Sequence, residues 1–217
     1  EMCIRDSMNT HLHILEPYTN LFRVWKDERL KRQLHNLVRL FIDRILDTET
    51  SHLQLFFNDD WESPYHIISY GHDIEASWLL HEAALVLGDK ALLNEVEPRV
   101  VDIAEAATEG FLPGAGMLYE QHVDTASIDA DRHWWVQAEA IVGYINLYQH
   151  FDDRLSLSRA VQCWEFVKRH LIDRENGEWY WSLRADGSVN RHEDKAGFWK
   201  CPYHNGRMCM EIIERFV

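Results

Sequence analysis

The chain has 217 residues, of which 46% are hydrophobic and 27% charged. These proportions are typical of a globular protein and exclude a disordered or collagen-like one. Asp and Glu (36) outnumber Lys and Arg (22), which gives a formal net charge of -14. Because an acidic surface repels phosphate groups, we expect neither nucleic acid nor an anionic membrane surface as a partner. No apolar run in the sequence is long enough to predict a transmembrane helix.

The N-terminus and the cysteines bear on compartment and processing. Residues 1–7 precede an abrupt helical pattern at Met8 and match no targeting signal, so we interpret them as a lead-in or an artefact. Without a signal peptide, the cytoplasm is the expected location.

No pair of cysteines has CxxC or zinc-ligand spacing, so we interpret all four as free, buried or half-buried thiols. They are Cys3, Cys163, Cys201 and Cys209.

Helical spacing of apolar residues predicts a chain of helices joined by short turns. The segment 54–60 is predicted as a loop or strand, 111–116 as a Gly/Pro-rich loop, and 179–181 as part of a small hairpin before Asp186. Pro98 either kinks the fourth helix or marks its true start. The predicted helices span residues 9–25, 28–47, 72–87, 90–108, 133–150, 153–172 and 204–217.

The predicted helices repeat in pairs. Asp27, Asp89 and Asp152 are 62 and 63 positions apart, and each stands between one helix and a longer amphipathic one. Three helical hairpins at one period, followed by the start of a fourth, predict an all-α toroid or solenoid. In such a fold the first helix of each pair lies inside and the second outside.

The candidate chemistry is histidine-based. His13, His72 and His204 each lie on a predicted inner helix, one in each of three repeats. A histidine titrates near neutral pH, so two on opposite sides of a carbon could remove a proton and return it. Glu75, three positions after His72, shares a helix face with it and could orient an imidazole.

Other chemistries stay open on the residues alone. His11 and His13 are two positions apart on a helix and face apart, which disfavours a shared metal. Paired carboxylates of a glycosidase remain an alternative, with Glu75, Asp131 and Glu139 as candidates. Trp135 and Trp199 are candidate platforms for a sugar ring, although tryptophan is also a common core residue. Of Trp134 and Trp135, we expect one in the core and one exposed to the cavity.

Four long motifs are similar to those of cellobiose 2-epimerases, a family within the N-acylglucosamine 2-epimerase superfamily. The similarity extends over residues 8–217 and so covers nearly the whole chain. The motifs are residues 9–16 (NTHLHILE), 69–80 (SYGHDIEASWLL), 134–140 (WWVQAEA) and 194–209 (DKAGFWKCPYHNGRMC).

The resemblance implies an (α/α)6 barrel that inverts C2 of the reducing-end sugar of β-1,4-linked disaccharides. Cellobiose would become glucosyl-mannose and lactose would become epilactose, without a metal or cofactor. By motif, His72 and His204 match the general acid/base pair, and His13 matches a histidine of ring opening and substrate contact. The residues that match substrate-binding positions are Asn9, Glu75, Trp135 and Trp199.

The chain departs from this family in length. Family members have six hairpins, so we expect residues 8–217 to be the C-terminal part of one barrel, lacking an N-terminal substrate-binding Arg. Such an incomplete barrel is expected to be unstable or inactive alone. Open alternatives are an N-acylglucosamine 2-epimerase, a mannose isomerase, an inactive truncated chain or a non-catalytic carbohydrate-binding protein. We expect a monomer or weak homodimer with a small-molecule disaccharide as partner.

Overall fold

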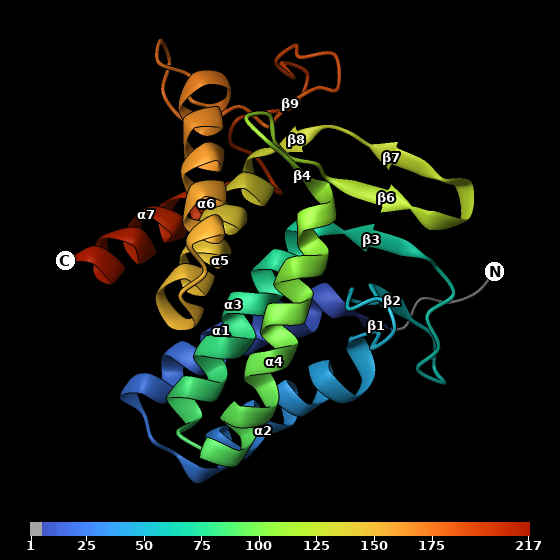
Figure 1. The fold of residues 1–217 in the computed structure, drawn as a ribbon, viewed down its shortest axis with the longest axis vertical. Helices are drawn as coiled ribbons and strands as arrows, with labels where there is room; N and C mark the ends of the chain where they lie inside the picture. Colours follow the sequence, from blue (N-terminus) through green and yellow to red (C-terminus); the bar gives the residue numbers. More distant parts are fainter. Residues whose placement is uncertain (1–5) are drawn as a thin grey trace.

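The computed structural model describes residues 6–217. Within them the helices pack in two rows (Figure 1). The inner row runs α1, α3, α5, α7, and α2, α4 and α6 form the outer row, each against the inner helix that precedes it. The predicted all-α fold of paired helices is confirmed. The helices are α1 (Met8–Val24), α2 (Glu28–Leu40), α3 (Tyr70–Leu87), α4 (Lys90–Ala107), α5 (Trp134–Phe151), α6 (Arg154–Phe166) and α7 (Tyr203–Phe216).

Burial separates the two rows as the sequence predicted. Nearly every residue of α3 and α5 is buried, because each has inner neighbours on two sides and an outer helix on a third. The outer helix α2 buries one stripe at helical spacing, Leu30, Leu34 and Val38, and leaves its charged face exposed. The apolar positions of the sequence therefore set which row a helix joins.

The outer helices begin at aspartate N-caps. Asp27 and Asp89 each accept hydrogen bonds from two backbone N–H groups at the start of α2 and α4. In the third repeat Asp152 stands between two helices as predicted, but the N-cap is the next residue. Asp153 caps α6, whereas Asp152 ends α5 in a left-handed conformation with φ 54°.

Two outer helices end in a π-helical turn that the sequence did not predict. The segment predicted as one helix over 28–47 is α2 followed by a π turn at Phe41–Ile45, and α6 likewise continues into Val167–Leu171. After each turn the chain forms an antiparallel bridge and heads back toward the next inner helix. Pro98 lies inside a continuous α4, so the proposal that it marks the helix start was wrong.

Short strands lie between the helices and lead into the inner ones. The predicted hairpin after residue 179 exists as a bridge between Leu183 and Val189, but its strand is Ser182–Leu183 rather than 179–181. The pairs are β1 (Asp6–Ser7) with β2 (Phe56–Phe57), β3 (Ile67–Ser69) with β6 (Glu120–His122) and β6 with β7 (Ser127–Asp129), β4 (Phe111–Leu112) with β5 (Gly116–Met117), and β8 (Arg132–His133) with β9 (Ser182–Leu183).

Of the predicted lead-in, residues 1–7, only residues 6 and 7 are described by the structure. The prediction for Cys3 therefore lies outside the described residues. Ser7 belongs to the fold: its hydroxyl accepts from the backbone N–H of Thr10 and caps α1. Cys163 is a free buried thiol as predicted, but Cys201 and Cys209 are exposed rather than buried. No helix among the described residues has the length and apolar character needed to cross a membrane.

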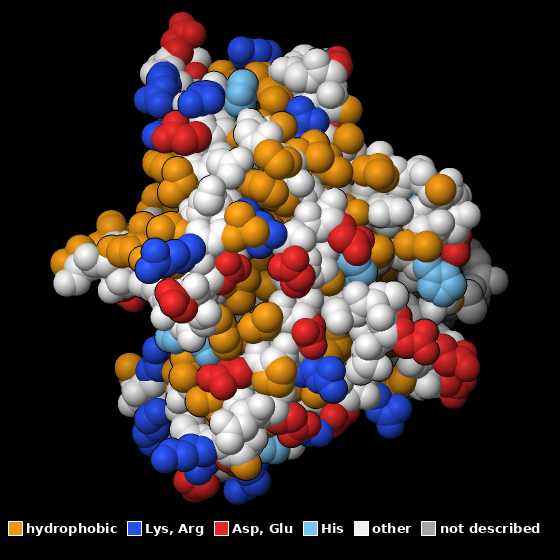
Figure 2. All heavy atoms as spheres, in the orientation of Figure 1, with side chains coloured by type: hydrophobic (Ala, Val, Ile, Leu, Met, Phe, Trp, Pro, Cys, Tyr) orange, Lys and Arg blue, Asp and Glu red, His pale blue; other side chains and the backbone are white. Residues whose placement is uncertain are grey.

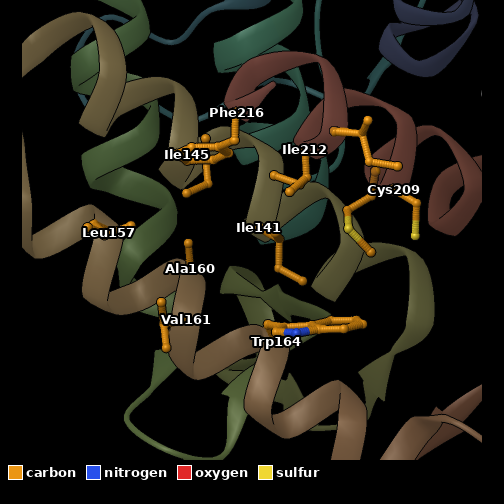
Figure 3. Close-up of a pocket in the computed structure, with 11 residues that line it drawn as sticks. Ile141, Ile145, Leu157, Ala160, Val161, Trp164, Cys209, Ile212 and Phe216 are labelled. Carbon is orange, nitrogen blue, oxygen red and sulfur yellow. The ribbon is translucent and has the colours of Figure 1, made fainter.

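An apolar groove runs between α5, α6 and α7. Its volume is ≈ 430 Å³, and Figure 3 shows Ile141, Trp164 and Ile212 among the side chains that line it. Figure 2 shows that apolar side chains gather along α7, the arm that projects at the left of the view. This groove contains none of the predicted site residues.

Candidate active site

Three predicted histidines meet at the N-terminal ends of the inner helices. The ring centroids of His13 and His204 are 6.4 Å apart. Trp135 joins this pair to the third histidine, since its ring lies 4.7 Å from His72 and 5.6 Å from His204. Segments up to 191 residues apart in the sequence thus place two imidazoles against one indole, with the third beside His204.

The histidines converge because the inner helices begin at the same level of the fold. His72, Trp135 and His204 lie in the first turn of α3, α5 and α7, and these helices are neighbours in the inner row. Close packing fixes α3 against α5 at this level, because a Cβ on Gly71 would come within 2.6 Å of the Trp135 ring. Glycine at this position lets the two helices approach closely.

Each histidine of the predicted acid/base pair has a different partner at Nδ1. The Ser69 hydroxyl lies 2.7 Å from His72 Nδ1. For His204, the Nδ1 partner is a carboxylate oxygen of Glu139, also at 2.7 Å. A carboxylate stabilises an imidazolium, whereas a hydroxyl is neutral, so the two rings sit in different electrostatic surroundings.

Beneath the histidines, one arginine gathers carboxylates from three helices. Arg207 Nη2 donates to one oxygen of Glu75 and one of Glu139, each at 2.7 Å. Its Nη1 lies 2.5 Å from a carboxylate oxygen of Glu16 and donates to the Tyr203 hydroxyl. That hydroxyl in turn donates to Glu16. We call Glu16, Glu75, Glu139 and Arg207 the arginine cluster.

The surroundings move the histidine pKa values in opposite directions. Burial, with the nearby His13 and His204, lowers the pKa of His72 to about 3. Burial also acts to lower the pKa of His204, but its hydrogen bond to Glu139 outweighs this and raises it. At neutral pH His72 is therefore neutral, and His204 holds a proton more readily than a free histidine. Desolvation and the neighbouring His204 lower the pKa of His13.

The two buried carboxyl groups of the cluster also differ. Burial and the charge of Glu139 raise the pKa of Glu75 to about 7. For Glu139, burial acts in the same direction, but Arg207 and His204 outweigh it and lower its pKa to about 2. Glu139 is thus the ionised partner of His204, and Glu75 titrates near neutral pH.

Glu75, Glu139 and His204 carry side chains of the kinds that bind metal ions. One ligand atom from each lies within 4.8 Å of the others. The Arg207 guanidinium already donates to both carboxylates there and supplies the positive charge that they require. We therefore interpret these residues as a buried ionic cluster, in which Arg207 rather than a metal ion balances the carboxylates.

The remaining predicted residues lie apart from the histidines or have other partners. Asn9 is exposed in the first turn of α1, and Trp199 is 80% exposed in the loop before α7, in ring contact with Phe198. Trp134 and Trp135 are both buried, and of the two the Trp135 ring lies beside His72. Asp131 accepts from Ser182 and from a backbone N–H in the β9 loop, away from the arginine cluster.

Sequence reasoning missed Ser69, Glu16, Tyr203 and Arg207. A signal for two of them was present: Glu16 follows His13 by three positions and Arg207 follows His204 by three, as Glu75 follows His72. On a helix this spacing puts both residues on one face. The same spacing on three inner helices indicates one charged layer below one histidine layer.

These features define a class. Paired inner and outer helices, with a histidine and carboxylate cluster at the inner N-terminal ends, are typical of part of an (α/α)6 barrel. The N-acylglucosamine 2-epimerase (GlcNAc 2-epimerase) family model matches residues 4–206. The chain belongs to that family.

Similar proteins are cellobiose 2-epimerases. The chain is 66% identical over 209 residues to the cellobiose 2-epimerase of Bacteroides fragilis, covering 96% of this chain and 53% of that protein. It is 42% identical over 210 residues to that of Dictyoglomus turgidum, with the same coverage of 96% and 53%. The solved cellobiose 2-epimerase of Bacillus thermoamylovorans B4167 has a TM-score of 0.91 at 45% identity, covering 98% of this chain and 54% of that chain. The chain thus spans about half the length of the curated relatives it matches.

Proposed function

We propose that this chain supplies the acid/base site of an epimerase that inverts C2 of the reducing-end sugar of a β-1,4-linked disaccharide. One observation carries the proposal: two histidines with oppositely shifted pKa values contact the same indole ring. A neutral base and a protonated acid near one carbon are what inversion through an enediolate requires.

The reaction begins with opening of the pyranose: neutral His13 takes the proton of the C1 hydroxyl, the bond between C1 and the ring oxygen breaks, and the ring oxygen takes a proton from solvent. The resulting C1 aldehyde acidifies the C2 proton. His72 takes that proton through Nε2, the C2–H electron pair forms a C1–C2 double bond, and the C1 oxygen becomes an enediolate oxyanion. His204 then returns a proton to the opposite face of C2 as the C1 carbonyl forms again. In the reverse direction the two histidines exchange roles, and solvent resets their protons.

Substrate contacts follow from the remaining positions. We propose that Trp135 stacks on the reacting sugar, since its ring lies beside both acid/base histidines. Asn9 and Trp199 would contact the sugar from exposed positions in the first turn of α1 and in the loop before α7. Glu75 would support the site indirectly, by its ion pair with Arg207, which also bonds the Glu139 partner of His204. No observation favours a glycosidase, because Arg207 bonds both Glu75 and Glu139.

The substrate proposal is cellobiose, converted to glucosyl-mannose, and lactose, converted to epilactose. Its support is that the relatives matching 96% of this chain are cellobiose 2-epimerases. An N-acylated sugar and free mannose are the competing substrates within the family.

The test uses a hybrid, because the chain spans about half of its relatives. This chain replaces the matching 209 residues of the Bacteroides fragilis cellobiose 2-epimerase. The hybrid and the purified chain are incubated with cellobiose, N-acetylglucosamine and mannose, and the products are identified by NMR. We expect the hybrid to form glucosyl-mannose. A ketose, free glucose or no product from the hybrid would contradict the proposal.

A further inference from the structure

We propose that Ser69 is a positioning residue for His72: its hydroxyl accepts the Nδ1 proton of the imidazole and so keeps Nε2 as the nitrogen that exchanges protons. The reaction step rests on the proposed function. The position of the proton does not, and it can be measured without turnover.

Ser69 occupies a helix-capping position but does not cap. It is the N-cap residue of α3, and its side chain accepts no backbone hydrogen bond from that helix. A serine hydroxyl at this position ordinarily accepts from a backbone N–H of the first turn, which stabilises a helix by about 1 kcal/mol. Ser7 forms such a cap on α1, and Asp89 forms one on α4. At α3 the hydroxyl instead lies 2.7 Å from His72 Nδ1.

Both partners of this contact, Ser69 and the His72 ring, are restrained by their neighbours. Ser69 is 1% exposed and ends strand β3, where it pairs with Glu120 of β6. The His72 ring is bounded by Trp135, at 4.7 Å and an interplanar angle of 49°. Strand pairing fixes the oxygen and indole packing limits the ring, so the histidine has little freedom to turn its other nitrogen toward Ser69.

The chemistry requires one tautomer. To take a proton through Nε2, neutral His72 must carry its own proton on Nδ1, and the imidazolium formed afterwards carries one there too. An oxygen that accepts from Nδ1–H serves both states. Serine adds no charge, unlike Glu139 at His204, so the bond orients His72 without favouring its cation. This agrees with the lowered pKa of His72.

The first test locates the proton by NMR in the purified, ¹⁵N-labelled hybrid. Two-bond ¹H–¹⁵N correlation of the His72 ring at neutral pH is expected to show the Nδ1–H tautomer in the wild type. Ser69→Ala is expected to populate the Nε2–H tautomer, and Ser69→Thr, which restores a hydroxyl, to recover the wild-type pattern. A wild-type His72 in the Nε2–H form, or a Ser69→Ala spectrum identical to wild type, would overturn the proposal.

Ser69→Gly separates positioning from helix capping. Glycine is within a few tenths of a kcal/mol of serine as an N-cap but has no hydroxyl. Positioning predicts that Ser69→Gly loses the tautomer preference as Ser69→Ala does. A tautomer preference retained by Ser69→Gly would refute it. Because glycine is a favourable N-cap residue, this variant also covers the case in which Ser69→Ala fails to fold.

The second test measures turnover in the hybrid. We expect Ser69→Ala to lower kcat about 10- to 100-fold with little change in KM, since the ring is misoriented but the sugar contacts remain. Asp89→Ala is the matched control: it removes a true N-cap, costs about 1 kcal/mol of stability and should leave kcat unchanged. Equal kcat in Ser69→Ala and wild type would overturn the proposal. A hybrid without epimerase activity whose His72 shows the Nδ1–H tautomer would refute the proposed function and leave the positioning intact.

Discussion

Removing the positive charge from the arginine cluster is expected to destabilise the protein strongly. In Arg207→Met the side chain keeps similar length and apolar contact but cannot neutralise a carboxylate. Glu75 and Glu139, whose side chains are 1% exposed, and Glu16, at 13%, then lose their shared partner. Arg207 also lies over the rings of Trp78 and Tyr203, at 5.0 and 4.6 Å from their centroids.

The size of the expected loss in unfolding free energy follows from the burial of the ion pairs. Breaking a buried ion pair by deleting one partner costs about 3–5 kcal/mol, because a charge is left without compensation. Protonation of Glu75, whose pKa is raised to about 7, relieves part of this cost at acidic pH. We therefore expect the full loss above neutral pH and a smaller one near pH 5. For a chain of this length, 3–5 kcal/mol corresponds to a fall in Tm of roughly 6–20 °C.

The assay is urea unfolding followed by far-UV circular dichroism, with thermal melts beside it. Arg39→Met is the matched control, since Arg39 bonds Asp43 and Glu95 at the surface, where both carboxylates are more than 40% exposed. Such exposed pairs contribute about 0–1 kcal/mol. A loss in Arg207→Met no larger than in Arg39→Met would refute the reasoning.

A double variant tests the cause of the loss. Arg207→Met with Glu75→Gln removes one of the carboxylates that the arginine compensates, so it is expected to be more stable than Arg207→Met alone. If the double variant is no more stable than Arg207→Met, uncompensated charge is not the cause.

Four further outcomes are expected. Burial raises the pKa of Glu75 from 4.5 to about 7, so its carboxyl favours folding below pH 4.5 and loses that contribution as pH rises through 7. Glu75→Gln should therefore flatten the fall in unfolding free energy across that window. Glu139→Gln should lower the His204 pKa, measured by NMR of its ring, and move the alkaline limb of hybrid turnover to lower pH, because less His204 is protonated. Gly71→Ala should cost about 1–3 kcal/mol in urea unfolding by forcing Trp135 to move. Gly206→Ala, where no atom lies within 4 Å of the added Cβ, should instead stabilise α7 by up to about 1 kcal/mol.

The sequence predicted features that depend on one helix at a time. The stripe of Leu30, Leu34 and Val38 identified an outer helix, and the aspartate spacing identified the repeat. The three histidines could be grouped because each lies in the first helix of its repeat. Periodicity and repeat position are local properties, so they can be read from a single chain.

Features that depend on how helices meet were not predicted. Asp73 lies next to His72 in the sequence, yet its carboxylate is fully buried and bonds His52 and the backbone N–H of Leu53. Arg207 could not be assigned to Glu16 without knowing that the first and last inner helices approach each other. The Ser69 bond was hidden for a different reason, since serine before a helix ordinarily predicts a cap.

The proton transfer at C2 is tested most directly by deuterium incorporation. The hybrid, its His72→Ala and His204→Ala variants and a His35→Ala control on α2 are incubated with cellobiose in D₂O, and C2 deuteration and epimer formation are followed by ¹H NMR. We expect wild type and His35→Ala to form epimer deuterated at C2, and both site variants to lose epimer formation by at least about 100-fold. Unlabelled epimer from the wild type, or epimer formed at the wild-type rate by either site variant, would contradict a His72–His204 acid/base pair.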